Sequence, residues 1–185
     1  AALQMKVHIM PSHAFSLDPQ AVTDYQAQGA VIIRAALSPD EVQLLSQGIE
    51  HNLAHLSPLA LVASLPDDPG RFVEDFCTWQ SNPAYQKILR DSALPSIAKQ
   101  LMQSETVRIY HDHMLVKEAA TRQPTPWHQD QPYYNISGQQ NVSFWIPVDP
   151  VPLESTLRFV AGSHQGTWYM PRTFRDNQAK WFAEG

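Results

Sequence analysis

The chain has 185 residues, enough for one domain with a substantial buried core. Its net charge of -5 at pH 7 argues against a nucleic-acid partner, because phosphate recognition normally needs a basic surface. No stretch approaches the length of a membrane span, and residues 1–10 lack a signal-peptide core. Cys77 is the single cysteine, which excludes an intrachain disulfide and a cysteine-rich zinc site. We therefore expect a cytoplasmic protein in which histidines and carboxylates would hold any metal.

The first half of the chain is predicted to be mainly helical. Asp18 followed by a proline is typical of a helix start, and we expect this helix to end near Gly29. Ser38 and Glu41 are spaced as a capping box at the start of a second helix. The elements expected in this half are helices over 19–29, 39–53, 82–90 and 92–102, with a β-branched strand over 30–34.

After residue 105 the pattern favours strands. The stretch 106–117 is rich in β-branched residues and lacks glycine and proline, which predicts one long strand. Further strands are expected over 127–130, 141–148 and 156–160. Helices followed by strands indicate an α+β protein with a sandwich or barrel core. We expect one domain, in which residues 1–105 form the mainly helical part and residues 106–185 the first half of the β core.

The triplet His128-Gln129-Asp130 is the strongest candidate for chemistry. Residues two apart in an extended segment point to the same face, so the imidazole of His128 and the carboxylate of Asp130 would converge. Two histidines and one carboxylate with open coordination positions are typical of non-haem iron(II) oxygenases. Such a triplet is common by chance, so the residues around it decide its meaning.

The surrounding motifs resemble those of the phytanoyl-CoA dioxygenase family in order and spacing. The resemblance covers roughly residues 18 to 170 and is strong because several motifs occur together. The motifs are GAVII (29–33), LSPDEV (37–42), WHQDQPYY (127–134), FWIPVD (144–149) and LRFVAGSH (157–164).

This resemblance implies a double-stranded β-helix (jelly roll, cupin-like) with the N-terminal helices packed on it. It also implies Fe(II) with 2-oxoglutarate and O2 as co-substrates, so that hydroxylation of a small organic substrate is coupled to decarboxylation of 2-oxoglutarate to succinate. His128 and Asp130 correspond to the first two iron ligands. Gln129, Trp145 and His113 correspond to positions that border 2-oxoglutarate. Halogenating relatives have a small residue in place of the carboxylate, so Asp130 favours hydroxylation.

The family pattern also requires a distal histidine as third ligand and an arginine that pairs with 2-oxoglutarate. No histidine follows His164, so the last strands of the barrel are expected to be missing from this chain. Three explanations are open: a fragment of a longer protein, strands supplied by another chain, or a degenerate homologue. We favour the fragment and expect it to be inactive by itself. Substrate identity and oligomeric state stay open.

Two other functions compete with the oxygenase. A jelly-roll binding module without catalysis would explain the missing distal histidine. A cupin-like metalloenzyme without a co-substrate could use His164 as its third ligand, although a histidine in a Gly-Ser-His turn is more often a hydrogen-bonding residue.

The expected elements lead to three further predictions, for the pair His111 and His113, for Asp112 and for Cys77. His111 and His113 would share a strand face, which indicates either a polar barrel interior, the interpretation we favour, or a second metal site. Asp112 would point to the opposite face and pair with a base. Cys77 is expected to be a small core residue.

Overall fold

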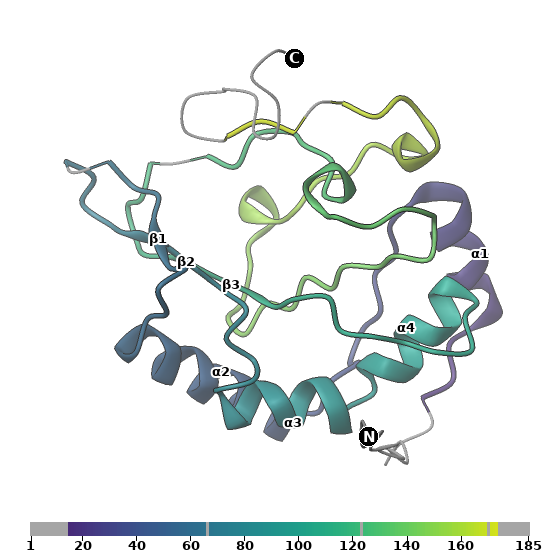
Figure 1. The fold of residues 1–185 in the computed structure, drawn as a ribbon, viewed down its shortest axis with the longest axis horizontal. Helices are drawn as coiled ribbons and strands as arrows, with labels where there is room; N and C mark the ends of the chain where they lie inside the picture. The colour runs from purple at the N-terminus through teal and green to yellow at the C-terminus, as the bar shows by residue number, and fades with distance from the viewer. Residues whose placement is uncertain (1–14, 66, 123, 170, 174–185) are drawn as a thin grey trace, which may run out of the picture.

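The computed structural model describes residues 15–65, 67–122, 124–169 and 171–173. These residues form an α+β structure with an antiparallel sheet of order β1-β2-β3 (Figure 1). None of the helices in this part of the chain combines the length and apolarity that crossing a membrane requires. The elements are α1 (Pro19–Gln28), α2 (Pro39–Ala54), β1 (Leu61–Val62), β2 (Phe72–Phe76), α3 (Pro83–Asp91), α4 (Leu94–Met102) and β3 (His113–Lys117), with short 3-10 helices η1 (Gln131–Tyr133), η2 (Leu153–Ser155) and η3 (Ser163–Gln165).

The predicted ends of α1 and α2 are confirmed. The carboxylate of Asp18 accepts a hydrogen bond from the backbone N–H of Gln20 at 2.8 Å. Gly29 ends α1 with a φ of 84°, a left-handed conformation in which glycine has no Cβ strain. At α2 the Ser38 hydroxyl accepts from the Glu41 N–H at 3.2 Å, and the Glu41 carboxylate accepts from the Ser38 N–H at 2.7 Å. Both halves of the capping box are therefore formed.

The helix α3 ends at Asp91 and α4 begins at Leu94, one and two residues later than predicted. Asn82 caps α3 by accepting from the N–H groups of the first turn. The Ser92 hydroxyl donates to the carbonyl of Ile88 and accepts from the N–H of Leu94, so one side chain serves both helix ends. Pro95 lies in the first turn of α4, where a proline is tolerated because no intrahelical N–H bond is needed.

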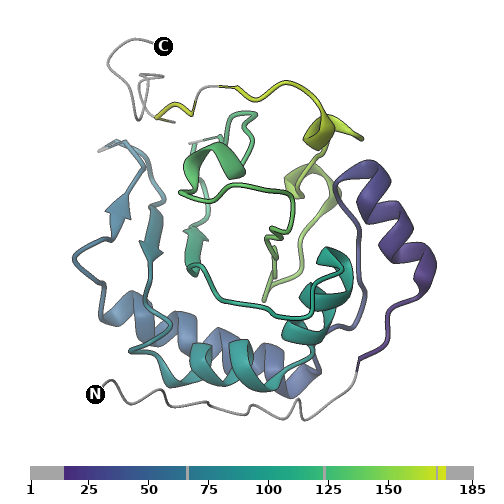
Figure 2. The same ribbon diagram turned by 45° about the vertical axis from the view of Figure 1, so that its right-hand side comes forward.

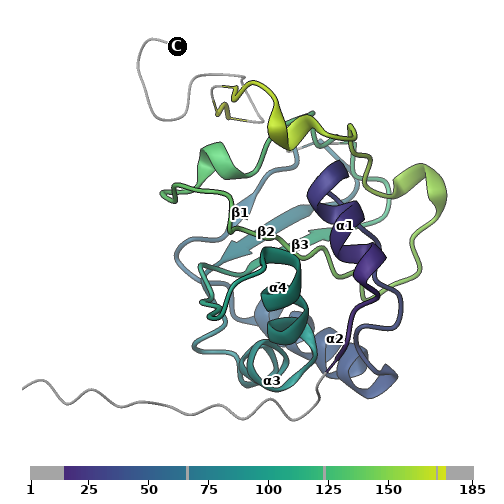
Figure 3. The same cartoon turned by 90° about the vertical axis from the view of Figure 1, so that its right-hand side faces the viewer.

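The sheet has one buried face and one face that is open except at Phe72, which is 4% exposed. In the antiparallel register Phe72 lies opposite Lys117, and Phe76 lies opposite His113. Successive residues alternate between faces, so Val73, Asp75 and Met114 point towards α2 and α3 and are buried. Figure 3 shows the sheet between these helices and the loops of the second half. The face towards the loops carries Phe72, Glu74, Phe76, His113, Leu115 and Lys117.

A buried carboxylate joins β2 to α2. Asp75 is 0% exposed and accepts hydrogen bonds from Asn52 Nδ2 at 2.7 Å and from the Ser57 N–H at 2.8 Å. It also accepts from the Phe76 N–H at 2.8 Å and from the Ser57 hydroxyl. Burial raises the pKa of Asp75, but these hydrogen bonds outweigh burial and leave the pKa below its ordinary value. The carboxylate is therefore ionised and fully hydrogen-bonded inside the protein.

The same polar network continues through Asn52 to α3 and to the segment before β3. Asn52 Oδ1 accepts from the Tyr85 hydroxyl at 3.3 Å and lies 3.0 Å from the Thr78 hydroxyl. That hydroxyl is also 2.9 Å from the Asp112 carboxylate, so it donates to one acceptor at a time. Asp112 accepts further from the N–H groups of Thr78 and Trp79. Among the described residues its hydrogen-bond partners are thus backbone N–H groups and a hydroxyl, and no ion pair with a base is found there, although its charge acts to raise the pKa of His111, against the effect of burial.

A second core lies between α1 and α4. Ile97 is 0% exposed and Leu101 2%, and both pack with Val31 and Ile33. Val31 and Ile33 are partly buried while Ile32 is 78% exposed, so the predicted alternation is present. The predicted strand over 30–34 is nevertheless wrong, because this stretch pairs with no other described strand.

The second half has less regular structure than predicted. The strand predicted over 106–117 forms only at its end, as β3, and the stretches 127–130, 141–148 and 156–160 are irregular in the described chain. A strand forms only where a neighbouring strand completes its backbone hydrogen bonds. The side-chain pattern of one segment does not identify which segment will pair with it. The sheet includes β1 and β2, which the sequence analysis missed because β2 carries two acidic residues that disfavour strands.

Cys77 follows β2 directly and is exposed. Its φ is 59°, a left-handed conformation that few residues other than glycine adopt. The prediction of a core cysteine is therefore wrong, because the chain turns out of the sheet at this residue.

The Asp75 network supports a stability prediction. In Asp75→Asn an amide NH2 replaces one carboxylate oxygen, so buried N–H donors from Ser57 or Asn52 lose their acceptor. We expect the free energy of unfolding at pH 7 to fall by about 2 to 3 kcal/mol, measured by urea denaturation. Asp149→Asn, which changes an exposed carboxylate, is the charge-matched control and should change stability little.

The stability difference should also depend on pH. The pKa of Asp75 is lower in the folded protein, so its contribution is present above the unfolded pKa, about 3.9, and is lost as pH falls through the folded value. The gap between wild type and Asp75→Asn should therefore be constant near neutrality and narrow below about pH 4. A gap that widens on acidification would contradict this role for Asp75.

Candidate metal centre

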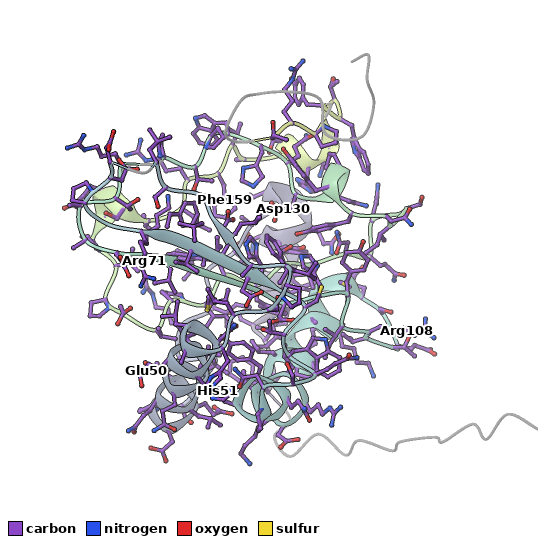
Figure 4. All side chains as sticks on the ribbon, turned by 60° about the vertical axis from the view of Figure 1, so that its left-hand side comes forward. Glu50, His51, Arg71, Arg108, Asp130 and Phe159 are labelled. Carbon is purple, nitrogen blue, oxygen red and sulfur yellow. The ribbon has the colours of Figure 1, made fainter. Side chains whose placement is uncertain are left out.

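The His128-Gln129-Asp130 segment lies on the open side of the sheet. Figure 4 shows Asp130 on the opposite side of the sheet from Glu50 and His51 of α2. The segment is irregular and ends in a bend at Asp130, directly before η1. His128 and Asp130 still point to a common place, because His128 Nε2 is 3.1 Å from Asp130 Oδ1. The predicted convergence is found, although the predicted strand is not.

The orientation of the His128 ring determines which nitrogen can bind a metal. Nδ1 lies 2.9 Å from the carbonyl oxygen of Pro126, which can only accept a hydrogen bond. Nδ1 therefore carries a proton, and in the neutral ring the lone pair is on Nε2, the nitrogen beside Asp130. Two ligands about 2.1 Å from one ion and at right angles to each other are about 3.0 Å apart. The observed spacing fits two adjacent ligands of a single divalent cation.

The electrostatics of the pair suit a cation. The hydrogen bond to Asp130 raises the pKa of His128, although burial acts in the opposite direction. The hydrogen bond from His128 lowers the pKa of Asp130, burial opposes this, and a hydrogen bond from Ser143 lowers it further. Both shifts favour the imidazolium–carboxylate form of the pair. A divalent cation bound by both residues would displace the Nε2 proton.

Aromatic rings surround the pair. The His128 ring is edge-on to Tyr133, with ring centroids 6.1 Å apart. The His111 ring is edge-on to Tyr110 and to Tyr134, each at 5.2 Å. Burial lowers the pKa of His111, and the neighbouring His113 lowers it further. The neutral imidazole of His111 therefore sits in an aromatic setting near the candidate metal centre.

His113 belongs to β3 and lies on the open face of the sheet. It stacks on Phe76, with ring centroids 4.0 Å apart, and its Nε2 is 3.2 Å from Glu74 Oε1. His111 precedes β3 and packs on tyrosines, so the two histidines do not share a strand face as predicted. The described residues contain no group of three histidine, cysteine or acidic side chains that could hold a metal. They therefore give no support to a second metal site at His111 and His113.

His164 is held at the C-terminus of α1. Its Nε2 lies 3.0 Å from the carbonyl oxygen of Gln26 and therefore donates to it, and Gln165 donates to the same oxygen at 3.1 Å. A Cβ on Gly29 would come within 2.4 Å of His164 Nδ1, so the ring packs directly on this glycine. These contacts satisfy carbonyl groups that the end of α1 leaves unpaired. Its recorded contacts are those of a helix-capping residue, and no metal-binding group of three includes it in the described chain.

The two other predicted cofactor-lining residues have different surroundings. Trp145 is 45% exposed, in an irregular stretch. The Gln129 amide is bonded at both ends to a distant backbone segment: Nε2 donates to the Thr167 carbonyl, and Oε1 accepts from the Tyr169 N–H, both at 3.0 Å. The role of these residues, and of His113, in binding 2-oxoglutarate stays a prediction.

Sequence reasoning missed Ser143 and Glu74. The Ser143 side chain acts to lower the pKa of both Asp130 and Tyr134, and Glu74 pairs with His113. Glu74 could have been found only by knowing the register of β2 against β3. Ser143 lies in an irregular stretch, and no sequence signal connects it to Asp130.

The comparisons with known proteins support the resemblance of the motifs. The model of the phytanoyl-CoA dioxygenase (PhyH) family matches residues 25–183 of the chain. In the other two comparisons, neither a curated protein nor a solved structure matched. The family match spans most of the chain and includes His128, Asp130 and every residue that surrounds them. The chain therefore belongs to the phytanoyl-CoA dioxygenase family.

Proposed function

We propose that His128 and Asp130 are two ligands of a non-haem Fe(II) site that hydroxylates a small organic substrate with 2-oxoglutarate and O2 as co-substrates. The family consists in general of Fe(II)- and 2-oxoglutarate-dependent oxygenases. The observation that carries the proposal for this chain is the 3.1 Å separation of His128 Nε2 and Asp130 Oδ1. An imidazole and a carboxylate are two of the donors of the facial arrangement that such enzymes use.

The remaining donor must come from elsewhere. Among the residues that the structure describes, no third histidine or acidic side chain joins this pair. The proposal therefore requires a ligand from outside the described residues, in this protein or in another chain. We likewise propose that β1, β2 and β3 are part of a jelly roll, as expected for the family. A cytoplasmic location remains our expectation.

Each residue of the pair is held by a neighbour. The carbonyl of Pro126 fixes the tautomer and the tilt of the His128 ring. His128 is the main cause of the lowered pKa of Asp130, and the Ser143 side chain lowers that pKa further. When bound, Fe(II) supplies the redox chemistry that couples decarboxylation of 2-oxoglutarate by O2 to hydroxylation of the substrate. The carboxylate at position 130 occupies a coordination position that a halide would need, which favours hydroxylation over halogenation.

The open face of the sheet provides a surface for the co-substrate. His113 and Trp145 match family positions that border 2-oxoglutarate, and we propose this role for both. The stack of His113 on Phe76 and its contact with Glu74 hold the imidazole at the end of β3. Gln129 would contribute to 2-oxoglutarate binding indirectly, by holding the backbone of residues 167–169 with its amide.

A non-catalytic binding module is the second candidate. It is favoured by one observation, the lack of a third donor among the described residues. In such a protein the same fold would bind its ligand without iron chemistry, and the His128–Asp130 ion pair would be structural.

Substitution of either ligand tests the oxygenase. In the complete protein, His128→Ala or Asp130→Ala should reduce succinate formation from 2-oxoglutarate by more than about 100-fold, because ligand loss exceeds the 10- to 100-fold effects of outer-shell changes. His51→Ala removes an exposed imidazole on the opposite side of the sheet and serves as the control. Full turnover in either ligand variant would end the proposal.

Anaerobic titration separates the oxygenase from the binding module. Complete protein mixed with Fe(II) and 2-oxoglutarate should show the weak visible absorption of the chelated co-substrate, because both must occupy one metal site. The band should be lost in Asp130→Ala. Absence of this band in the complete protein would favour the binding module.

A further inference from the structure

The Gln129 side chain forms a two-point contact with a segment far along the chain. Its Nε2 donates to the carbonyl of Thr167, and its Oε1 accepts from the N–H of Tyr169, each at 3.0 Å. A primary amide presents one donor group and one acceptor next to each other, as the edge of a neighbouring strand does. Gln129 thus stands in for a strand partner of residues 167–169, which belong to no helix or strand.

A second side chain of the same loop holds the next stretch. The Tyr133 hydroxyl donates to the carbonyl of Arg172 and accepts from the Arg172 N–H at 2.9 Å. Both contacts bind the backbone, so they depend on the position of the segment and not on its side chains. Figures 1 and 2 show the yellow stretch beyond η3 passing over the green segment around η1. Residues 129–133 and this later stretch are therefore joined at two points.

The position of Gln129 gives the contact a consequence for the metal centre. Gln129 lies directly between His128 and Asp130, and its side chain is directed to residues 167–169 while those of its neighbours meet each other. In the described chain residues 128–130 belong to no strand. The hydrogen bonds of Gln129 therefore limit rotation of the backbone that carries both ligands. Fixed ligand geometry is what gives a metal site its affinity.

We propose that Gln129 is a positioning residue, whose amide clamps residues 167–169 to the loop that carries the candidate iron ligands. The proposal rests on the proposed function for its metal. Tyr133 supports the same clamp through the backbone of Arg172.

The test compares two methionine substitutions. Gln129→Met keeps the length of the side chain and removes both hydrogen bonds of the clamp. Gln131→Met is the matched control, because the Gln131 amide donates to the carbonyl of Gly138 in the same loop and not to residues 167–169. Hydrogen–deuterium exchange measures the Tyr169 amide directly, and titration with Mn(II) measures the metal site without turnover.

In Gln129→Met we expect the Tyr169 amide to exchange at least about fivefold faster, as for loss of one hydrogen bond. We expect Mn(II) to bind roughly tenfold more weakly, the effect typical of losing a residue that orients ligands. The control should change neither quantity. Gln129→Glu retains an acceptor for the Tyr169 N–H, so the Tyr169 amide should stay protected from exchange in that variant. The same variant replaces Gln129→Met in the test if Gln129→Met does not fold.

Three results would overturn the proposal: unchanged exchange of the Tyr169 amide in Gln129→Met, equal acceleration in the Gln131→Met control, or faster exchange with unchanged Mn(II) affinity. Failure of the complete wild-type protein to bind Mn(II) would count against the proposed iron site instead. In that case exchange of the Tyr169 amide would still decide whether the clamp exists.

Discussion

The buried carboxylate of Asp75 is the constraint on which the arrangement of the first half depends. A fully buried charge is tolerated only when hydrogen bonds replace the lost water, and Asp75 receives them from α2, from the Ser57 segment and from its own strand. Each of these partners must stay in place for the carboxylate to remain satisfied. The network therefore locks β2 onto α2 and, through Asn52, onto α3.

The hydrogen bonds of Asp75 also determine which side chains lie on the other face of the sheet. Residues of β2 alternate, so fixing Asp75 inwards directs Glu74 and Phe76 outwards, and the register then places His113 beside them. The candidate metal centre lies on this side, built from the loop around His128 and from Ser143. The sheet joins this side of the molecule to the helices, while hydrogen bonds from Gln129 and Tyr133 join the loop around His128 to residues 167–172.

The chemistry of the pair follows from its two neighbours. Pro126 accepts the Nδ1 proton of His128, which leaves Nε2 as the nitrogen that meets the carboxylate. The pKa of Asp130 is lowered chiefly by His128, with a smaller contribution from Ser143. In the proposed site the two donor atoms already have the spacing of adjacent metal ligands, so metal binding would require little reorganisation.

Local signals in the sequence determined the helices and the site residues. Asp18, Ser38 and Glu41 marked helix starts because capping involves residues only a few positions apart. The pair His128 and Asp130 was also visible, since two residues separated by one are neighbours in almost any extended backbone.

Tertiary structure alone decided the strands and the surroundings of the site. The stretch 141–148 has the composition of a strand but no backbone partner in the described chain, whereas β2 is a strand despite two acids because β1 and β3 flank it. Gln129 meets Thr167 and Tyr169, and His164 meets Gln26, across separations of more than thirty residues. Such contacts depend on the tertiary fold, because a local pattern of side chains does not determine which distant segment will lie next to it.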